Sequence, residues 1–278
     1  PTKNFGFLSN SLENGLREAK AKGVSAIYLK PGVHKVQVKK NEDGNDRNYI
    51  EIDSPITIGG AGTDKTFVEG GLLIEGKKWN GEVVVKKMTV QKSKGHGLYC
   101  GDGCKVNFTC INVNFTECGL CGVVAHGTNG KLVDCQITRC RSSGIYCYDN
   151  GLIEVVGEKT MVTGNGTKMD KNEHGLCARH LSSKIVVLSP LTKELVSTNN
   201  SSGGNWGGAG KIENIFSLEE MMSKVDEDGR LHVRPGLNSV AKMFASIKHH
   251  NVRVSEVYLE SGVHKVQVKK NEDGNDRN

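Results

Sequence analysis

The sequence predicts a parallel β-helix, a solenoid in which three short strands form each coil. A phrase that begins with glycine and alternates like a strand recurs at residues 97–100, 122–125, 144–147 and 175–178. Such self-similarity is typical of stacked repeat architectures. Side chains alternate across a strand, so stacking the phrases creates two inward columns. The first column contains Leu98, Val123, Ile145 and Leu176, and the second contains Cys100, Ala125, Cys147 and Ala178.

Two further strands per coil are indicated by apolar residues on either side of these phrases. The strand before each phrase is marked by Met88 and Val90, Ile111 and Val113, and Cys135 and Ile137. The strand after it is marked by Val106, Leu132, Ile153 and Ile185. The coils repeat after roughly two dozen residues, which predicts about seven or eight of them before residue 188. Each coil is expected to bond to the next at about 4.8 Å.

Residues 1–24 are expected to form a helical cap on the open end of the solenoid. The solenoid itself is expected to consist of residues 25–197. Leu12, Leu16 and Ala19 share one helical face, Ser11 is a typical helix-starting residue and Gly23 a typical terminator. A covered end protects the stack from edge-to-edge association.

The rest of the chain divides into a linker and a tail. Residues 198–211 are rich in Gly, Ser and Asn and are expected to form a linker. Residues 212–278 are expected to contain a helical segment and the start of a second tandem β-helix unit, because residues 262–278 repeat residues 32–48 letter for letter. The sequence does not distinguish a natural duplication from an engineered one. We expect the tail to pack on its own last coil or to dock head-to-tail on a neighbour.

Composition argues against several classes of function. The net charge of +6 is modest and only 5% of residues are aromatic, so no nucleic-acid partner is expected. No apolar run is long enough to span a membrane. The Asp-rich residues 39–48 lack the glutamate that closes a calcium loop, and neither a metal nor another cofactor is expected. The cysteines are interpreted as small core residues, which favours an intracellular protein, whereas several glycosylation sequons leave the compartment open.

The chain resembles the pectin-lyase-like superfamily of right-handed parallel β-helices over about residues 10–197. The resemblance lies in the cap helix, the strand and Pro-Gly turn at residues 28–33, the segment 56–62 and the Gly-Ile-Tyr-Cys-Tyr-Asp-Asn-Gly phrase at 144–151. That last phrase is similar to carbohydrate-binding and sugar-hydrolysis repeats such as those of F-box β-helix proteins. The resemblance implies the fold more than the activity, because the superfamily includes lyases, hydrolases, epimerases and non-catalytic scaffolds.

One catalytic resemblance concerns His96. Residues 95–97 look like the Gly-His-Gly motif of polygalacturonases. The Asn-Thr-Asp, Asp-Asp and Arg-Ile-Lys motifs that accompany it in that family are absent from this sequence. An inverting hydrolase needs an acid and a base on opposite sides of the scissile bond. We therefore interpret His96 as a residue of a coil turn.

A polar strip is expected along one edge of the coils, either as a solvated turn edge or as the lining of a shallow groove for an extended glycan or peptide. It contains Asp102, His126, Tyr148, Asp149, Arg179 and His180, which together with His96 are the candidate ligand-binding residues. Asp102 and Asp149 are two coils apart, roughly 9.6 Å, which is too far for them to share a calcium ion.

The function predicted from these observations is a non-catalytic scaffold that binds a glycan or protein partner along one face and can assemble end to end. The alternatives are a polysaccharide-active lyase, hydrolase or epimerase, and a purely structural array. No catalytic residue is assigned.

Overall fold

The computed structural model describes residues 6–40, 44–75, 80–101, 105–167, 172–201, 203–216, 220, 230–233, 237–250 and 256–259. The chain forms two compact units. The first contains residues 1–187 and 191–213, and the second contains residues 188–190 and 214–278. The duplicated segment 262–278 lies outside the described residues.

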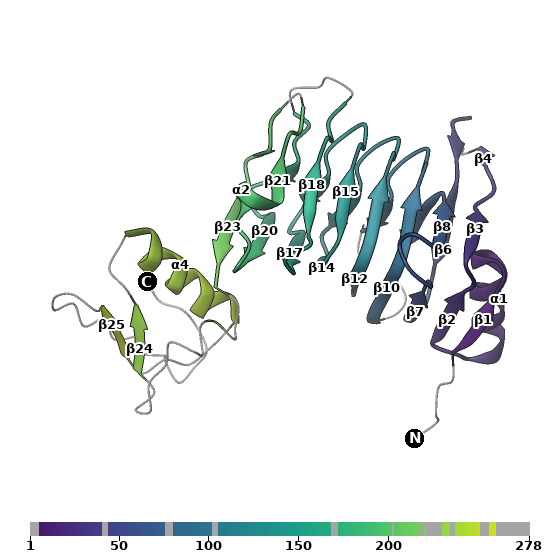
Figure 1. Cartoon of the computed structure of the whole chain (residues 1–278), viewed down its shortest axis with the longest axis horizontal. Helices are drawn as coiled ribbons and strands as arrows, with labels where there is room; N and C mark the ends of the chain where they lie inside the picture. Colours follow the sequence, from purple (N-terminus) through teal and green to yellow (C-terminus); the bar gives the residue numbers. More distant parts are fainter. Residues whose placement is uncertain are drawn as a thin grey trace. The chain divides into compact units, whose positions relative to one another are not determined.

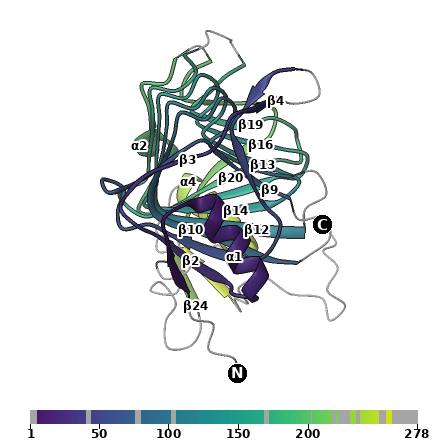
Figure 2. The same ribbon diagram turned by 90° about the vertical axis from the view of Figure 1, so that its right-hand side faces the viewer.

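The first unit is a solenoid of parallel strands that wind through three faces (Figures 1 and 2). It has about six turns, where seven or eight coils were expected. The first face contains β1 (Phe7–Ser9), β2 (Ala26–Leu29), β7 (Ile56–Gly59), the starts of β10 (Asn80–Gln91) and β12 (Lys105–Thr116), β14 (Asn129–Val133), β17 (Leu152–Val156), β20 (Lys184–Leu188) and β23 (Lys211–Ile215). The second face contains β3 (Gly32–Lys35), β8 (Thr66–Glu69), the ends of β10 and β12, β15 (Gln136–Thr138), β18 (Met161–Thr163) and β21 (Ser197–Thr198). The third face contains β6 (Tyr49–Ile52), β9 (Gly71–Ile74), β11 (Leu98–Cys100), β13 (Val123–His126), β16 (Ile145–Tyr148), β19 (Leu176–Ala178) and β22 (Trp206–Gly207).

Single residues with left-handed backbone form the corners on both sides of the second face. Asparagine and aspartate tolerate this conformation better than most residues. The corner before the second face is formed by Lys87, Asn112 and Asp134, and the corner after it by Lys92, Glu117 and Arg139. Because the corners are short and equivalent, outward side chains on neighbouring coils stay in register.

The two inward columns predicted from the glycine phrases are confirmed. Leu98 pairs with Val123, Val123 with Ile145, and Ile145 with Leu176, and all are fully buried. The column that begins with Cys100 is in register in the same way. The recurring glycines let neighbouring coils pack closely, because a Cβ on Gly122 would lie 2.3 Å from Ile137 Cγ2.

The register of the preceding strand differs from the expectation by two residues between β10 and β12. Met88 pairs with Val113 rather than with Ile111, and Val90 pairs with Phe115. Ile111 lies before the left-handed corner at Asn112 and is 37% exposed. The corner reverses the alternation of side chains, so counting from the apolar pairs alone placed Ile111 on the wrong side of the strand.

The N-terminal cap is helix α1 (Leu12–Lys22), which lies beside β1 and β2 (Figure 1). Its limits follow the predicted signals. The Ser11 side chain accepts a hydrogen bond from the Asn14 N–H, and Gly23 is left-handed at the C-terminus. Leu12 and Ala19 are buried against the solenoid.

Residues 198–211, expected as a linker, include further strands of the solenoid. The third-face strand β22 pairs with β19, and the first-face strand β23 begins at Lys211. The short helix α2 (Lys193–Val196) and β21 precede them. Asn200 fixes this segment, because its side-chain amide donates to the Val162 and Thr198 carbonyls at 3.0 and 3.1 Å. The many glycine, serine and asparagine residues of this segment form tight turns between short strands. Composition alone does not distinguish such turns from a linker.

The second unit contains a β–α–β arrangement of the same order as the N-terminal cap. It consists of β24 (Arg230–Val233), α4 (Leu237–His250) and β25 (Glu256–Leu259). The strands are parallel and pair Leu231 with Val257, as Phe7 pairs with Ile27 in the first unit. Tyr258 follows Val257 in β25, as Tyr28 follows Ile27 in β2. A second tandem β-helix therefore stays a prediction. The strand–helix–strand order of this unit matches that of the N-terminal cap.

The small hairpin β4 (Lys39–Lys40) and β5 (Asp46–Arg47) projects from the first coils. None of the helices within the described ranges has the length and apolar character needed to cross a membrane.

Candidate functional site

Aromatic and charged side chains gather at the C-terminal ends of the third-face strands. We call this group the Tyr–His strip, and it consists of Tyr99, His126, Tyr146, Tyr148, Asp149 and His180. Tyr99 and Tyr146 point outward because their neighbours on either side fill the inward columns. His126 pairs with Tyr148 on the adjacent strand.

The hydroxyl of Tyr99 connects two coils of the strip. Its oxygen lies 2.9 Å from His126 Nδ1 and 3.0 Å from the hydroxyl oxygen of Tyr148. Val124 is the residue in register with Tyr99 on β13, and it is small and buried. The Tyr99 side chain therefore reaches over it towards β16.

Asp149 joins two histidines from different coils. Its Oδ2 lies 3.1 Å from His126 Nε2, and its Oδ1 lies 2.7 Å from His180 Nδ1. An ionised carboxylate only accepts hydrogen bonds, so both ring nitrogens donate to it. In a neutral His126, Nδ1 then accepts a hydrogen bond from the Tyr99 hydroxyl, and the Tyr148 hydroxyl donates a hydrogen bond to the Tyr99 oxygen. The result is a directed chain from Tyr148 through Tyr99 and His126 to Asp149.

The rings of the strip form a nearly continuous surface. His126 and Tyr148 stack with centroids 4.0 Å apart and an interplanar angle of 18°. Tyr148 also makes edge contacts with Tyr146 at 5.4 Å and with His180 at 6.3 Å. The His126 side chain is 21% exposed and that of His180 is 49% exposed. The strip is therefore an open surface that can contact a ligand.

Gly101 makes room for this arrangement on the neighbouring coil. A Cβ at Gly101 would lie 2.4 Å from His126 Cβ, closer than real side chains approach. The glycine after the Leu98–Cys100 strand thus determines whether the His126 ring can occupy its position.

His96 lies in the turn before β11, where its imidazole takes part in the hydrogen bonding of the turn. The ring Nδ1 accepts a hydrogen bond from the backbone N–H of Cys121 at 3.2 Å, and the backbone N–H of His96 donates to the Tyr49 hydroxyl at 2.5 Å. Burial, assisted by the positive charge of Arg47, lowers the pKa of His96 to about 4. His96 is therefore neutral at pH 7, and its ring stacks on Tyr99 with centroids 5.6 Å apart.

Arg179 lies beside the strip, at the end of β19. Its N–H donates to the Cys147 carbonyl at 2.8 Å. Burial raises the pKa of Tyr146 to about 12, and the Arg179 charge acts against that increase. Asp102 lies outside the described residues, so the structure does not place it.

Sequence reasoning missed Tyr99 and Tyr146 as members of the strip. Both stand between two inward residues of a glycine phrase, which is a signal that they face outward. Their role in the strip depends on which side chains of neighbouring coils a tyrosine hydroxyl can contact. The alternation of inward and outward residues predicts the direction of a side chain but not these contacts.

The cysteines do not form a metal site among the residues that the structure describes. Eight of them are free and buried, including Cys118 and Cys121 of the Cys-x-x-Cys segment. Burial raises the pKa of Cys121 well above its ordinary value, so the thiol stays protonated. They fill the interior as small apolar side chains.

Comparisons with known proteins agree with this architecture. Residues 70–175 match the family model of the right-handed β-helix region. The fold is a right-handed parallel β-helix. This confirms the fold implied by the resemblance to the pectin-lyase-like superfamily. No curated protein matches the chain.

Among solved structures, the A-module of mannuronan C-5 epimerase AlgE4 from Azotobacter vinelandii is similar to this chain, with a TM-score of 0.48 and 12% sequence identity. The match covers 80% of this chain and 66% of that module.

Proposed function

We propose that the first unit is a scaffold that binds an extended polysaccharide along the Tyr–His strip. The observation that carries this proposal is the contiguous ring surface of Tyr99, His126, Tyr148 and His180. The apolar faces of sugar rings pack on aromatic faces, and the hydroxyls around them need polar partners. The strip offers both kinds of contact on neighbouring coils.

Preorganisation favours this surface as a binding site. The hydrogen bonds of Tyr99 and Asp149 hold the rings in place before a ligand arrives. Rigid side chains lose little conformational entropy on binding, so more of the contact energy remains as affinity.

The single carboxyl group of the strip supports binding rather than glycoside hydrolysis. Asp149 is the single carboxylate among the residues of the strip, and two histidines contact it. Glycoside hydrolases of the common types place two carboxyl groups on either side of the scissile bond. The strip as defined lacks that pair.

Binding is tested by affinity electrophoresis of the whole chain in gels that contain one of two acidic polymers, alginate or polygalacturonate. We expect at least one polymer to retard the protein and Tyr148→Ala to weaken that binding roughly tenfold, because this ring contacts three others of the strip. Tyr28→Ala is the matched control, since Tyr28 is 40% exposed on the first face. Equal losses in both variants, or no retardation in any gel, would contradict the proposal.

A second candidate is a polysaccharide lyase or epimerase, and the chain of Tyr99, His126 and Asp149 favours it. A hydroxyl bonded to a histidine that is oriented by a carboxylate is typical of general acid–base catalysis. The test is incubation with uronate-containing polymers and mass spectrometry of the products. If the wild type forms unsaturated or epimerised products and the His126→Gln variant does not, the protein is an enzyme. If the polymers remain unchanged, the binding scaffold is the supported function.

A further inference from the structure

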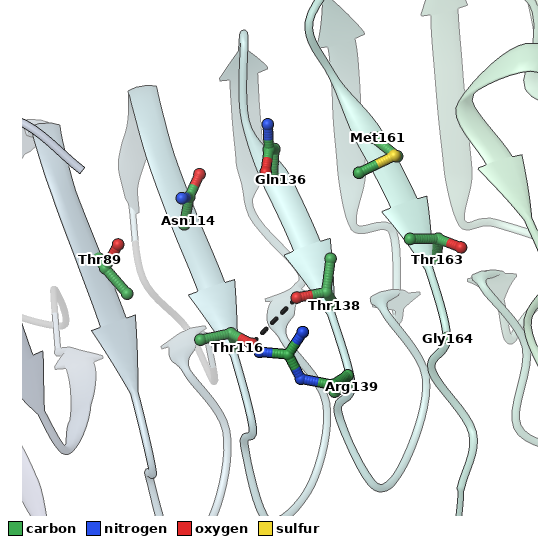
Figure 3. A pocket seen from close by; sticks show the side chains of 9 residues that line it. All are labelled: Thr89, Asn114, Thr116, Gln136, Thr138, Arg139, Met161, Thr163 and Gly164. Atoms are coloured by element: carbon green, nitrogen blue, oxygen red, sulfur yellow. Dashed lines mark hydrogen bonds between the residues drawn. The ribbon is translucent and has the colours of Figure 1, made fainter. Parts of the chain in front are cut away.

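A second surface lies on the second face, away from the strands of the Tyr–His strip. It is a shallow groove of about 390 Å³ that crosses four successive coils, from β10 through β12 and β15 to β18 (Figure 3). Its lining residues are Thr89, Asn114, Thr116, Gln136, Thr138, Arg139, Met161, Thr163 and Gly164. The volume falls within the range of small-molecule sites.

The outward residues of the groove form two registered rows. One row runs along Thr89, Asn114, Gln136 and Met161, and the other along Thr116, Thr138 and Thr163. Neighbouring coils are separated by about 4.8 Å, so the four-residue row presents side chains at regular steps over about 14 Å and the threonine row over about 10 Å. Such a row can make similar contacts with successive units of a linear polymer.

The groups in the groove are mainly uncharged hydrogen-bonding groups. Hydroxyls and primary amides dominate, and the Met161 thioether adds an apolar contact. Arg139 contributes the one charge among the lining residues, and its guanidinium Nη2 lies 3.1 Å from Glu117 Oε1. That ion pair reduces the attraction for an anionic ligand. The lining contains no carboxylate that could pair with a cation.

Several of these groups are fixed before any ligand binds. The Thr116 and Thr138 hydroxyl oxygens lie 2.9 Å apart, as the dashed line in Figure 3 shows. The Thr89 hydroxyl donates to the Thr63 carbonyl at 2.6 Å, and both Thr89 and Thr116 are buried, so they belong to the floor of the groove. Threonine is stiff at χ1, and all these residues stand on hydrogen-bonded strands.

From this placement we propose that the second-face groove is a separate binding site for a neutral polysaccharide. An uncharged, polyhydroxylated chain matches the hydroxyls and amides of the lining, and its repeat can follow the coils. Apolar ligands would leave these polar groups unpaired, which costs binding energy. The site is independent of the function proposed for the Tyr–His strip, because the two surfaces share no residue.

The test is affinity electrophoresis of the whole chain in galactomannan and in hydroxyethyl cellulose. The informative variant is Thr116→Val with Thr138→Val, which removes two hydroxyls and keeps both the shape and the strand propensity. The matched control is Thr57→Val with Thr109→Val, the same changes on the first face. Gln136→Ala, at an exposed position, provides a second groove variant that does not depend on the threonines.

We expect the wild type to be retarded by at least one of these neutral polymers and the groove double variant to bind it roughly tenfold more weakly. Gln136→Ala is expected to weaken binding in the same gels, whereas the first-face control and Tyr148→Ala should bind like the wild type. Melting temperatures establish that each variant is folded. The proposal is overturned if neither polymer retards the wild type, if both groove variants bind normally, or if Tyr148→Ala alone abolishes the binding.

Discussion

The third-face strip and the second-face groove stand on the same coils but differ in chemistry. The strip collects rings and charges where strands end, with Asp149 between His126 and His180. The groove collects hydroxyls and amides along the strands, where Thr116 contacts Thr138. Both are outward rows above fully buried residues, with Ile145 beneath the strip and Ile137 beneath the groove.

This difference shows how a solenoid separates folding from function. The inward rows are constrained by close packing, so they contain small and medium apolar residues on every face. The outward rows have no such constraint and can carry different ligands on different faces. The variants below test whether that separation holds, from the largest expected effect to the smallest.

The inward residues beneath both surfaces should matter most for stability. Ile145→Ala and Ile137→Ala each remove a fully buried side chain and should lower the free energy of unfolding by roughly 2–5 kcal/mol. The outward changes Gln136→Ala and Tyr148→Ala should cost much less. Urea unfolding of the four variants checks this, and equal costs for inward and outward changes would contradict the separation.

Acid should destabilise the third face through His96. Its pKa falls from 6.5 to about 4 on folding, so the unfolded chain binds the proton first as the pH decreases. The free energy of unfolding should therefore fall between pH 6.5 and 4, by about 3 kcal/mol, and level off below that range. His96→Asn keeps an acceptor near the Cys121 N–H and should remove this part of the pH dependence. Identical pH profiles in wild type and variant would exclude His96 as the cause.

Tyr146 should titrate at unusually high pH. Burial raises its pKa to about 12, so the free energy of unfolding should decrease as the pH rises from about 10 to 12. Arg179→Gln removes the charge that opposes this increase and should raise the pKa further. Ultraviolet titration of tyrosinate, compared with that of Tyr146→Phe, measures both. A Tyr146 that ionises near pH 10 would contradict the burial of its hydroxyl.

The ion pair at the edge of the groove should have the smallest effect. Arg139 and Glu117 are 63% and 46% exposed, and exposed pairs contribute about 0.2–1 kcal/mol. Arg139→Gln should therefore change stability little, and high salt should remove that small difference. A loss larger than that of Gln136→Ala would mean that Arg139 supports the fold of the second face.

The sequence predicted the interior better than the surface. The glycine phrases identified the columns that begin at Leu98 and Cys100, because inward residues must pack at every coil. Tyr99 was missed, because its bond to Tyr148 crosses two coils and depends on the small Val124 between them. Ile111 was misplaced by the left-handed corner at Asn112, because the equivalent corners at Lys87, Lys92, Glu117 and Arg139 are formed by residue types that do not favour this conformation and so give no common signal in the sequence.

The groove also went unrecognised, for a physical reason. Threonine is common in strands whatever its function, so the row through Thr116 and Thr138 has no distinct signature in the sequence. Its meaning depends on the register of neighbouring coils, which the structure supplies.

The central claim is that the Tyr–His strip binds a polysaccharide, and hydrogen exchange of the whole chain with and without a retarding acidic polymer tests it most directly. We predict slower amide exchange in residues 123–128 and 145–151, around β13 and β16, with the first face unchanged. Protection confined to the first face, or no protection under conditions in which the polymer is bound, would contradict the claim.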